Sequence, residues 1–186
     1  EDGSDLADTE TAPNAGELAF LLHNGDMAKR IRDYDWSQSL GPIAQWPQSL
    51  KTAVGLLVHS PTPIVLLWGE DGIMIYNDAY AQFAGRRHPE LLGSKVREGW
   101  PEVADFNDNI MKVVMAGGTL TYTNHFLDLD RRGKLERVWL ELGYSPVFAE
   151  DGKPGGVIAI VVETTDRVLA DERRAQEQER QRRLFE

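Results

Sequence analysis

The sequence contains no cysteine among its 186 residues. This absence excludes disulfide bonds, thiolate chemistry and cysteine-ligated metals. Long apolar runs are missing as well, since none approaches the roughly 18–20 residues that a membrane-spanning helix needs. We therefore predict that the segment does not insert into a membrane. The lack of cysteine leaves the redox compartment undetermined, but the composition is compatible with a cytosolic protein, and a cytoplasmic location is our expectation.

Basic residues are outnumbered in this chain. It has 20 Lys and Arg against 30 Asp and Glu, which gives a formal net charge of -10 and a pI near 4.9. Nucleic-acid binding needs a basic face that neutralises phosphates, and anionic lipid attracts basic segments. The charge balance therefore argues against both kinds of partner.

Short catalytic motifs are absent too. The sequence has no G-x-S-x-G, no P-loop, no H-E-x-x-H and no glycine-rich dinucleotide turn after a strand. Its histidines lie far apart at positions 23, 59, 88 and 125, and none forms a pair with metal-ligand spacing. We predict that this segment is not an enzyme and that it has no metal site.

The first 60 residues divide into two parts. Residues 1–16 are acidic and poor in bulky apolar groups, so they predict a disordered lead. Residues 17–60 predict an N-terminal helical extension: Leu18, Leu21 and Leu22 begin an apolar stripe, and a second helix follows Pro47. The first of these helices has no evident core of its own, so we expect it to pack outside the core or against a partner.

The hydrophobic periodicity changes after residue 60. Two short β-rich runs, "PIVLLWG" and "GIMIYN", precede a short helix, "DAYAQFAG", and a longer one, "DFNDNIMKVVMAGG". Three longer strands follow, "TLTYTNHFLDLD", "LERVWLELGYSPVF" and "GGVIAIVVETT". Hairpin-linked strands of this order predict an α+β domain over residues 61–165, with a five-stranded antiparallel sheet and helices capping one face. The gap between cap and sheet is the natural place for a pocket.

Residues 166–186 predict a long C-terminal exit helix. The segment "DRVLADERRAQEQERQRRLFE" alternates acids and bases without Gly or Pro, and its apolar stripe is thin. Two interpretations stay open. The helix is either solvated along its length or a signalling helix that pairs with a second copy through residues such as Leu169.

Several motifs, taken in order, resemble a PAS domain. "IMIYNDAYAQFAG" places Asn77 after the second strand and Gly85 at the end of the helix, and "HPELLGSKVREGWPEV" follows as a helical turn. "VVETTDR" resembles the family's Asp-x-Thr signature, with Glu163 in place of Asp. The stretch "DWSQSLGPIAQWPQSLKTAVGLLVHSP" resembles the segment ahead of PAS domains in bacterial sensor histidine kinases. The likeness covers residues 36–167.

This resemblance implies a sensory module of bacterial two-component signalling. A ligand- or partner-induced change would pass through the exit helix to an output domain of the same chain, a histidine kinase, and the module would act as a homodimer. Glu163, Thr165 and Arg167 lie where the last strand meets the helix, so they are the implied signal-coupling residues; an ordinary surface acid beside a capping threonine is the alternative. Leu18, Leu21, Leu22 and Leu169 are the dimer candidates.

The resemblance also limits the cofactor. Cysteinyl-flavin photochemistry is excluded because it needs a cysteine, and haem is disfavoured because the helix before the third strand has no histidine. A non-covalent flavin or a small metabolite stays open. Candidate pocket residues are Tyr76, Asn77, Tyr80, Phe83, Met111, Met115, Tyr122, Asn124, Trp139 and Tyr144.

A rival interpretation is a ligand-free structural module that only sets dimer geometry. Most apolar pocket candidates are needed merely to pack helices on a sheet. Polar side chains on the inner face of the sheet would favour sensing, and a wholly apolar inner face would favour scaffolding. An enzyme on this scaffold ranks last, because no catalytic set of residues is present.

Overall fold

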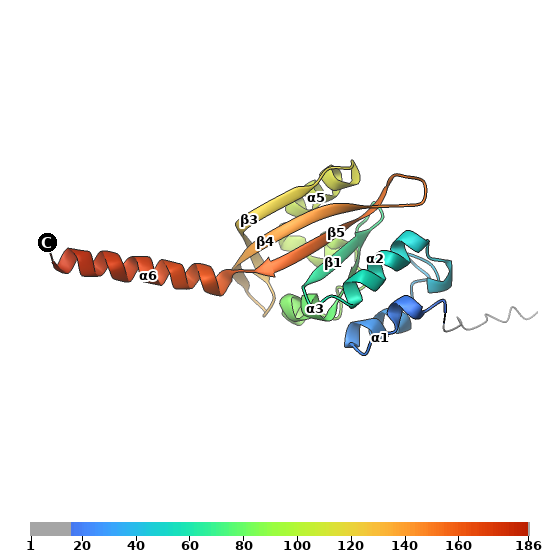
Figure 1. The fold of residues 1–186 in the computed structure, drawn as a ribbon, viewed down its shortest axis with the longest axis horizontal. Helices are drawn as coiled ribbons and strands as arrows, with labels where there is room; N and C mark the ends of the chain where they lie inside the picture. Colours follow the sequence, from blue (N-terminus) through green and yellow to red (C-terminus); the bar gives the residue numbers. More distant parts are fainter. Residues whose placement is uncertain (1–15, 186) are drawn as a thin grey trace, which may run out of the picture.

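The computed structural model describes residues 16–185, so the predicted disordered lead lies almost wholly outside the described residues. Five strands form one antiparallel sheet in the order β2-β1-β5-β4-β3 (Figure 1). They span β1 Ile64–Trp68, β2 Ile73–Tyr76, β3 Leu120–Asp130, β4 Leu135–Phe148 and β5 Pro154–Glu163. The last strand, β5, pairs with both β1 and β4 and is therefore the central strand of the sheet. The predicted α+β fold is confirmed.

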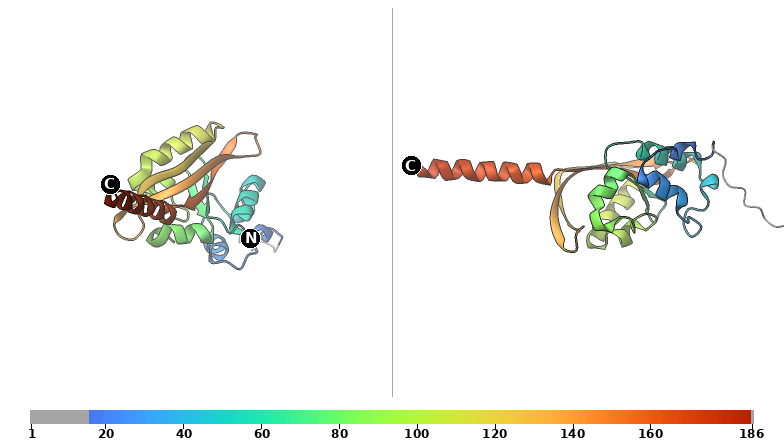
Figure 2. Two further views of the ribbon diagram at one scale, coloured as in Figure 1. Left: turned by 60° about the vertical axis from the view of Figure 1, so that its left-hand side comes forward. Right: turned by 90° about the horizontal axis from the view of Figure 1, so that it is seen from below.

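Helices between β2 and β3 cap the inner face of the sheet. They are α3 Asp78–Ala84, η3 Gly85–Arg87, α4 Val96–Gly99, η4 Pro101–Val103 and α5 Ala104–Met115. The ribbon shows α3 and α5 on the same side of the sheet (Figure 2). Strand β4 alternates accordingly, because a half-covered strand buries every second side chain. Its buried residues are Val138, Leu140, Leu142 and Tyr144.

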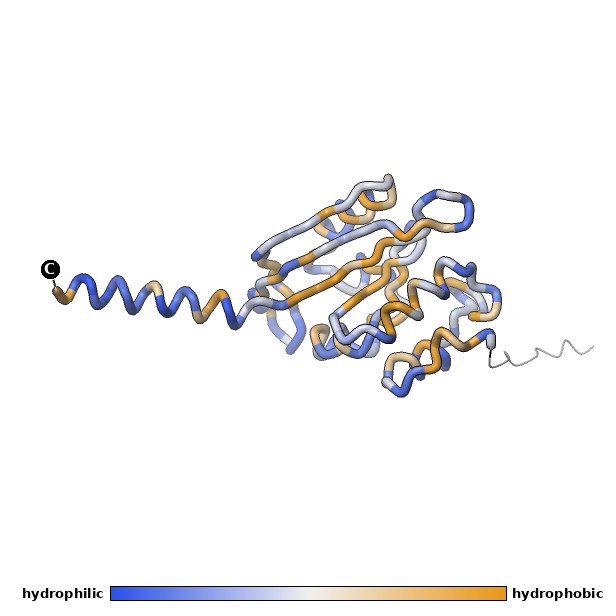
Figure 3. Tube along the Cα trace, in the orientation of Figure 1, coloured by the Kyte–Doolittle hydropathy of each residue, from blue (hydrophilic) through white to orange (hydrophobic). Residues whose placement is uncertain are grey.

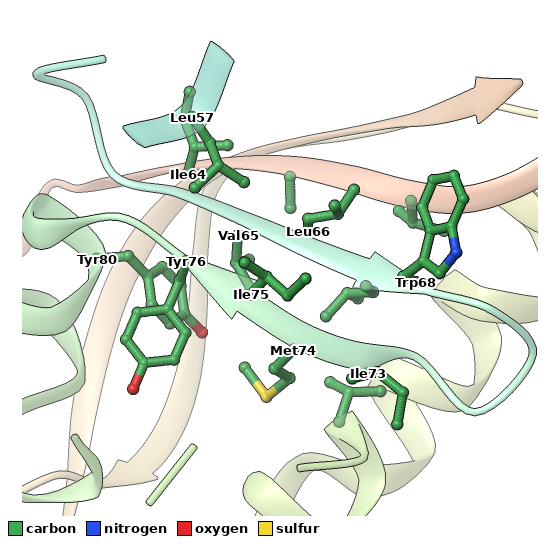
Figure 4. Close-up of a cluster of buried hydrophobic side chains, with 14 of the residues drawn as sticks. Leu57, Ile64, Val65, Leu66, Trp68, Ile73, Met74, Ile75, Tyr76 and Tyr80 are labelled. Atoms are coloured by element: carbon green, nitrogen blue, oxygen red, sulfur yellow. The ribbon is translucent and has the colours of Figure 1, made fainter. Parts of the chain in front are cut away.

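Strands β1 and β2 are buried on both faces, and all nine of their residues are buried. Leu57 and Ile64 lie on one side of this strand pair, and Met74 and Tyr80 lie on the other (Figure 4). Leu57 comes from α2 (Gln48–Val58), which packs on the outer face. This explains why these two strands read as continuous apolar runs rather than alternating ones.

The N-terminal extension is part of this core. It comprises η1 Ala19–Leu21, α1 Asp26–Asp33, η2 Ile43–Gln45 and α2. The expectation that its first helix lacks a core is wrong, because Leu21 is fully buried among this chain's own residues. Leu18 is partly buried, and Leu22 is 64% exposed. Of the three leucines proposed for a dimer contact, only Leu22 thus lies mainly on the surface.

Helix α1 is held by a cap that comes from another helix. The Met27 N–H donates to Asp78 Oδ1 at 3.0 Å, and Asp78 lies 51 residues further along the chain in the first turn of α3. Gly25, which precedes α1, allows this approach, since a Cβ there would lie 2.1 Å from Asp78 Oδ2. The extension is therefore attached to the helical cap as well as to the sheet.

The exit helix α6, Thr165–Leu184, leaves the end of β5 and projects away from the sheet (Figure 1). None of its residues is buried. Its trace is mostly hydrophilic, in contrast to the core-facing helices (Figure 3). The helix begins one residue earlier than predicted, at the second threonine of the "ETT" motif.

Candidate sensory site and its link to the exit helix

A cavity of about 50 Å³ lies between the helical cap and the inner face of the sheet. Its walls come from β1–β5, α3, α4, η4, α5 and the turn at Trp100, and the lining is Val65, Leu67, Met74, Tyr80, Phe83, Val96, Trp100, Val103, Asn107, Leu127, Leu129, Leu140, Leu142, Tyr144 and Val161. Pockets for drug-sized ligands measure about 300–1,000 Å³. In this conformation the cavity is too small for a flavin.

The polarity of the cavity is low. Its polar groups are the hydroxyls of Tyr80 and Tyr144, the amide of Asn107 and the indole of Trp100. Trp100 Nε1 donates to the Tyr80 hydroxyl at 3.1 Å. Burial raises the pKa of Tyr80 and of Tyr144, so both hydroxyls keep their protons. The lining residues are all uncharged, so the cavity is suited to neutral groups.

The structure brings three of the predicted pocket residues, Tyr80, Phe83 and Tyr144, onto the cavity wall. The other candidates lie outside its lining. Tyr76 is fully buried, and its hydroxyl is 2.9 Å from His88 Nδ1. Met111 is a packing residue whose sulfur would lie 3.3 Å from a Cβ at Gly72.

Three further candidates, Tyr122, Asn124 and Trp139, lie on β3 and β4 at positions outside the cavity lining. A bulge between Tyr122 and His125 leaves Tyr122 at one side of the inner face, where its ring contacts Phe106. Asn124 lies in the bulge with a φ of 47° and is exposed. Trp139 pairs with Phe126 on the outer face, because it lies between the inward-facing residues Val138 and Leu140 of β4. Met115 is partly buried at the end of α5.

Asn77 fastens the cap rather than lining the cavity. Its Oδ1 accepts from the Ile64 N–H at 3.2 Å and from the Tyr80 N–H at 3.0 Å. Its Nδ2 donates to carbonyl oxygens at the end of α2 and in the loop to β1, those of Leu57, Ser60 and Thr62. One buried amide thus caps α3 and holds the connection from α2 to β1.

Sequence reasoning missed the residue that pairs with Glu163. Arg131 lies in the turn between β3 and β4, and its side chain is only 7% exposed. Its Nη1 donates to Glu163 Oε1 at 2.7 Å and its Nη2 to Oε2 at 3.3 Å. Its Nε donates to Glu136 Oε1 at 3.0 Å. A two-point contact of this kind fixes geometry as well as charge.

Arg131 also contacts the cavity wall. Its Nη1 donates to the Phe83 carbonyl at 3.1 Å, and its guanidinium lies 5.1 Å from the centre of the Phe83 ring. Its own carbonyl accepts from the Arg86 N–H at 2.9 Å. Gly85 has a φ of 61°, and a Cβ there would lie 2.7 Å from the Arg131 carbonyl oxygen. Glycine at position 85 therefore lets the cap meet the hairpin.

Thr165 continues this chain of contacts into α6. Its hydroxyl donates to Glu163 Oε2 at 2.8 Å and accepts from the Trp139 N–H at 3.0 Å. Partial burial acts to raise the pKa of Glu163, but the hydrogen bonds from Arg131 and Thr165 and the charge of Arg131 lower it overall below its ordinary value of 4.5. The carboxylate is therefore ionised at neutral pH.

Within residues 16–185, Arg167, the third predicted coupling residue, forms no hydrogen bond or ion pair with Glu163. Its Nη2 donates to Asn124 Oδ1 at 3.1 Å and to Glu141 Oε1 at 2.9 Å. Because both partners are exposed side chains, these contacts link α6 to strands β3 and β4 at the surface and contribute little to stability.

Comparisons with known proteins define first the fold and then the family. The PAS domain of Bordetella pertussis BvgS has a TM-score of 0.51 at 20% identity, over 71% of this chain and 98% of that one. The Rhodobacter sphaeroides LOV protein has a TM-score of 0.48 at 15% identity, over 62% and 67%. A sensory box sensor histidine kinase from Vibrio cholerae has a TM-score of 0.42 at 17% identity, over 62% and 91%.

The sequence model of the PAS fold matches residues 57–169, more than half of the chain. The chain belongs to the PAS family, as its motifs indicated. No curated protein matches the sequence. Within residues 16–185, no helix has the length and apolarity to cross a membrane, and no group of three or more His, Cys, Asp or Glu is placed to hold a metal ion.

Proposed function

We propose that this PAS domain receives a ligand- or partner-induced change at its helical cap and transmits it through α6 to an output domain. The observation that carries the proposal is the continuous chain of contacts from Phe83 through Arg131 and Glu163 to Thr165. Phe83 lines the cavity, and Thr165 is the first residue of α6. A displacement of the helical cap would therefore reach α6 through these hydrogen bonds and the ion pair.

The proposed output domain is a histidine kinase. This choice rests on the segment that precedes β1, which resembles the segment ahead of PAS domains in bacterial sensor histidine kinases. A helix without buried residues is suited to the role, because its direction is set by its first turn and by the domain to which it connects.

We test the coupling with a matched pair of variants in the protein that carries both this chain and its output domain. Glu163 and Glu136 both pair with Arg131, but only Glu163 contacts α6. Glu163→Gln should change the rate of autophosphorylation at least several-fold, whereas Glu136→Gln should leave it near that of the parent. Equal rates in the two variants would contradict the proposed route.

We also propose that the domain works as a homodimer through the outer face of β3, β4 and β5, which α2 leaves uncovered. Phe126 is 43% exposed, Ile160 48% and Val162 41% on this face, and Leu169 of α6 is 37% exposed. Val162→Glu should then lower the sedimentation coefficient. Leu22→Glu is the control, and loss of the dimer in that variant alone would assign the interface to the N-terminal extension.

The second candidate function is a ligand-free structural module, and the small cavity favours it. Native mass spectrometry of the protein purified without refolding separates the two. A bound small molecule would show that the cavity expands around a ligand. An unliganded protein whose kinase rate still depends on Glu163 would assign the input to a partner.

A further inference from the structure

The residue before α6 carries a buried hydroxyl without a partner. Thr164 is 7% exposed, and its Oγ1 is fully buried without a hydrogen-bond partner among the described residues. Buried hydroxyls nearly always find a partner, so this one requires an explanation. Both backbone polar groups of Thr164 are hydrogen-bonded. Its N–H donates to the Trp139 carbonyl at 2.8 Å, and its carbonyl accepts from the Val168 N–H at 3.0 Å.

Thr164 occupies the N-cap position of α6 but does not cap it. Threonine is a favoured N-cap residue when its backbone is extended, because its hydroxyl then accepts from the second or third N–H of the helix. Asn77 does this at α3, where its ψ of 176° lets it accept from the Tyr80 N–H. Thr164 has a ψ of 12°, and α6 has no side-chain cap.

Thr165 holds the junction in this conformation. Its hydroxyl bonds both the Trp139 N–H and the Glu163 carboxylate, so the first residue of α6 is anchored to the sheet. Capping by Thr164 requires rotation about its Cα–C bond to an extended ψ. This rotation carries Thr165 away from Trp139 and Glu163, so the two arrangements exclude each other.

We propose that Thr164 and Thr165 form a two-state hinge for the exit helix. In the anchored state, which the structure shows, Thr165 bonds the sheet and the Thr164 hydroxyl is unpartnered. In the capped state, the Thr164 hydroxyl accepts from the Arg167 N–H, Thr165 is released, and α6 leaves the sheet in another direction. Each state satisfies the hydroxyl of one threonine at the expense of the other.

The surroundings of α6 permit this change. Because no residue of α6 is buried, its reorientation uncovers only partly buried apolar side chains such as Val168 and Ala170. The contacts given up outside the threonine pair are the exposed bonds from Arg167 to Asn124 and Glu141. Glu163 couples the hinge to Arg131 and the cap, so the use of the hinge in signalling rests on the proposed function; the two states themselves do not.

The test is a distance measurement on this chain, which has no native cysteine to interfere with labelling. Spin labels are placed on cysteines introduced at Thr121 in β3 and Gln176 in α6, both of which are exposed. Thr164→Val retains the shape and cannot cap, and Thr165→Val cannot anchor. We expect one distance in Thr164→Val, and at least a five-fold larger population of a second distance in Thr165→Val than in the parent.

Identical distance distributions in the parent and both variants would overturn the hinge. Thr164→Asn supplies an independent variant if Thr165→Val does not fold: it offers a stronger cap with the anchor intact, and it should also increase the second population. Thermal unfolding adds a further criterion. Thr164→Val should raise Tm, because it removes an unsatisfied buried hydroxyl, and a lowered Tm would show that the hydroxyl is partnered in the anchored state.

The kinase assay separates the hinge from the proposed function. Two distances together with kinase rates unaffected by Thr164→Val and Glu163→Gln would keep the hinge and reject the signalling role. A single distance in all variants, together with a kinase rate that depends on Glu163, would reject the hinge and keep the role.

Discussion

The N-terminal helices and the exit helix α6 adjoin the same sheet, yet the first bury their apolar side chains against it while α6 has no buried residue. Residues 17–56 lie outside the family match, whereas the start of α6 lies within it. The bounds of the family match therefore do not coincide with the parts of the chain that pack against the sheet. The extension contributes to the stability of the domain, and α6 depends on a few polar bonds at its first turn.

The two regions also differ in how they are fastened. The extension is held by buried side chains such as Leu21, Met27 and Ile31 and by the cap from Asp78. Helix α6 carries exposed ion pairs such as those of Glu177 and Glu179, which contribute little to stability. Displacement of the extension would uncover buried apolar side chains, whereas displacement of α6 would uncover none that is fully buried.

The largest expected loss of stability is for a substitution in the N-terminal extension. Leu21→Ala should lower the free energy of unfolding by about 3 kcal/mol, because it leaves a cavity in the core. For a domain of this size, Tm should fall by roughly 6–12 °C. Leu22→Ala is the matched control, with an expected change within about 0.5 kcal/mol. Similar losses in the two variants, measured by thermal unfolding, would show that the extension is not packed as described.

An intermediate effect is expected at the junction with α6. Glu163→Gln should lower the free energy of unfolding by about 2 kcal/mol at pH 7, less than for a fully buried pair because Glu163 is partly exposed and Arg131 keeps Glu136. The folded-state pKa of Glu163 lies below its ordinary value of 4.5. Its contribution is therefore complete above pH 4.5 and is lost as the pH falls through the folded-state pKa.

Urea unfolding of both proteins at a series of pH values checks this prediction. The difference between the parent and Glu163→Gln should be constant from neutral pH down to about 5 and should shrink below 4.5. A difference that grows on acidification would contradict the lowered pKa, because it would mean that folding raises the pKa of Glu163.

The smallest effect is expected along α6. Glu177→Gln removes the ion pair with Arg180 and should change the free energy of unfolding by less than about 0.5 kcal/mol. High salt should remove even this difference, because both side chains are exposed. A loss above about 1 kcal/mol in urea unfolding would show that α6 is packed in solution, and it would weaken the contrast between the two regions.

Much of the fold could be predicted because local patterns agree with it. The strands alternate or run continuously apolar as their burial requires, and Asn77 and Gly85 occupy positions that their residue types suit. Three of the pocket candidates line the cavity for the same reason, since Tyr80 and Phe83 lie on the short capping helix and Tyr144 on an inner position of β4.

The features that escaped prediction depend on contacts between distant residues. Arg131 stands in the turn "RRGK", where a basic residue is ordinarily solvated, and it is 32 residues from its partner Glu163. The bulge in β3 shifts the register, so the face on which Asn124 lies cannot be counted from the strand alone. Leu21 and Leu22 are neighbours of the same type, and only the fold distinguishes the buried one from the exposed one.

The packing of α2 on the outer face of the sheet has a consequence for how this domain can be transferred between proteins. A gene fusion cut at residue 57, where the family match begins, would remove most of α2 and uncover Ile64, Leu66 and Ile75 on the outer face of the sheet. Such a fragment would expose a contiguous apolar surface that favours aggregation. An intact transfer therefore has to include the extension together with the sheet.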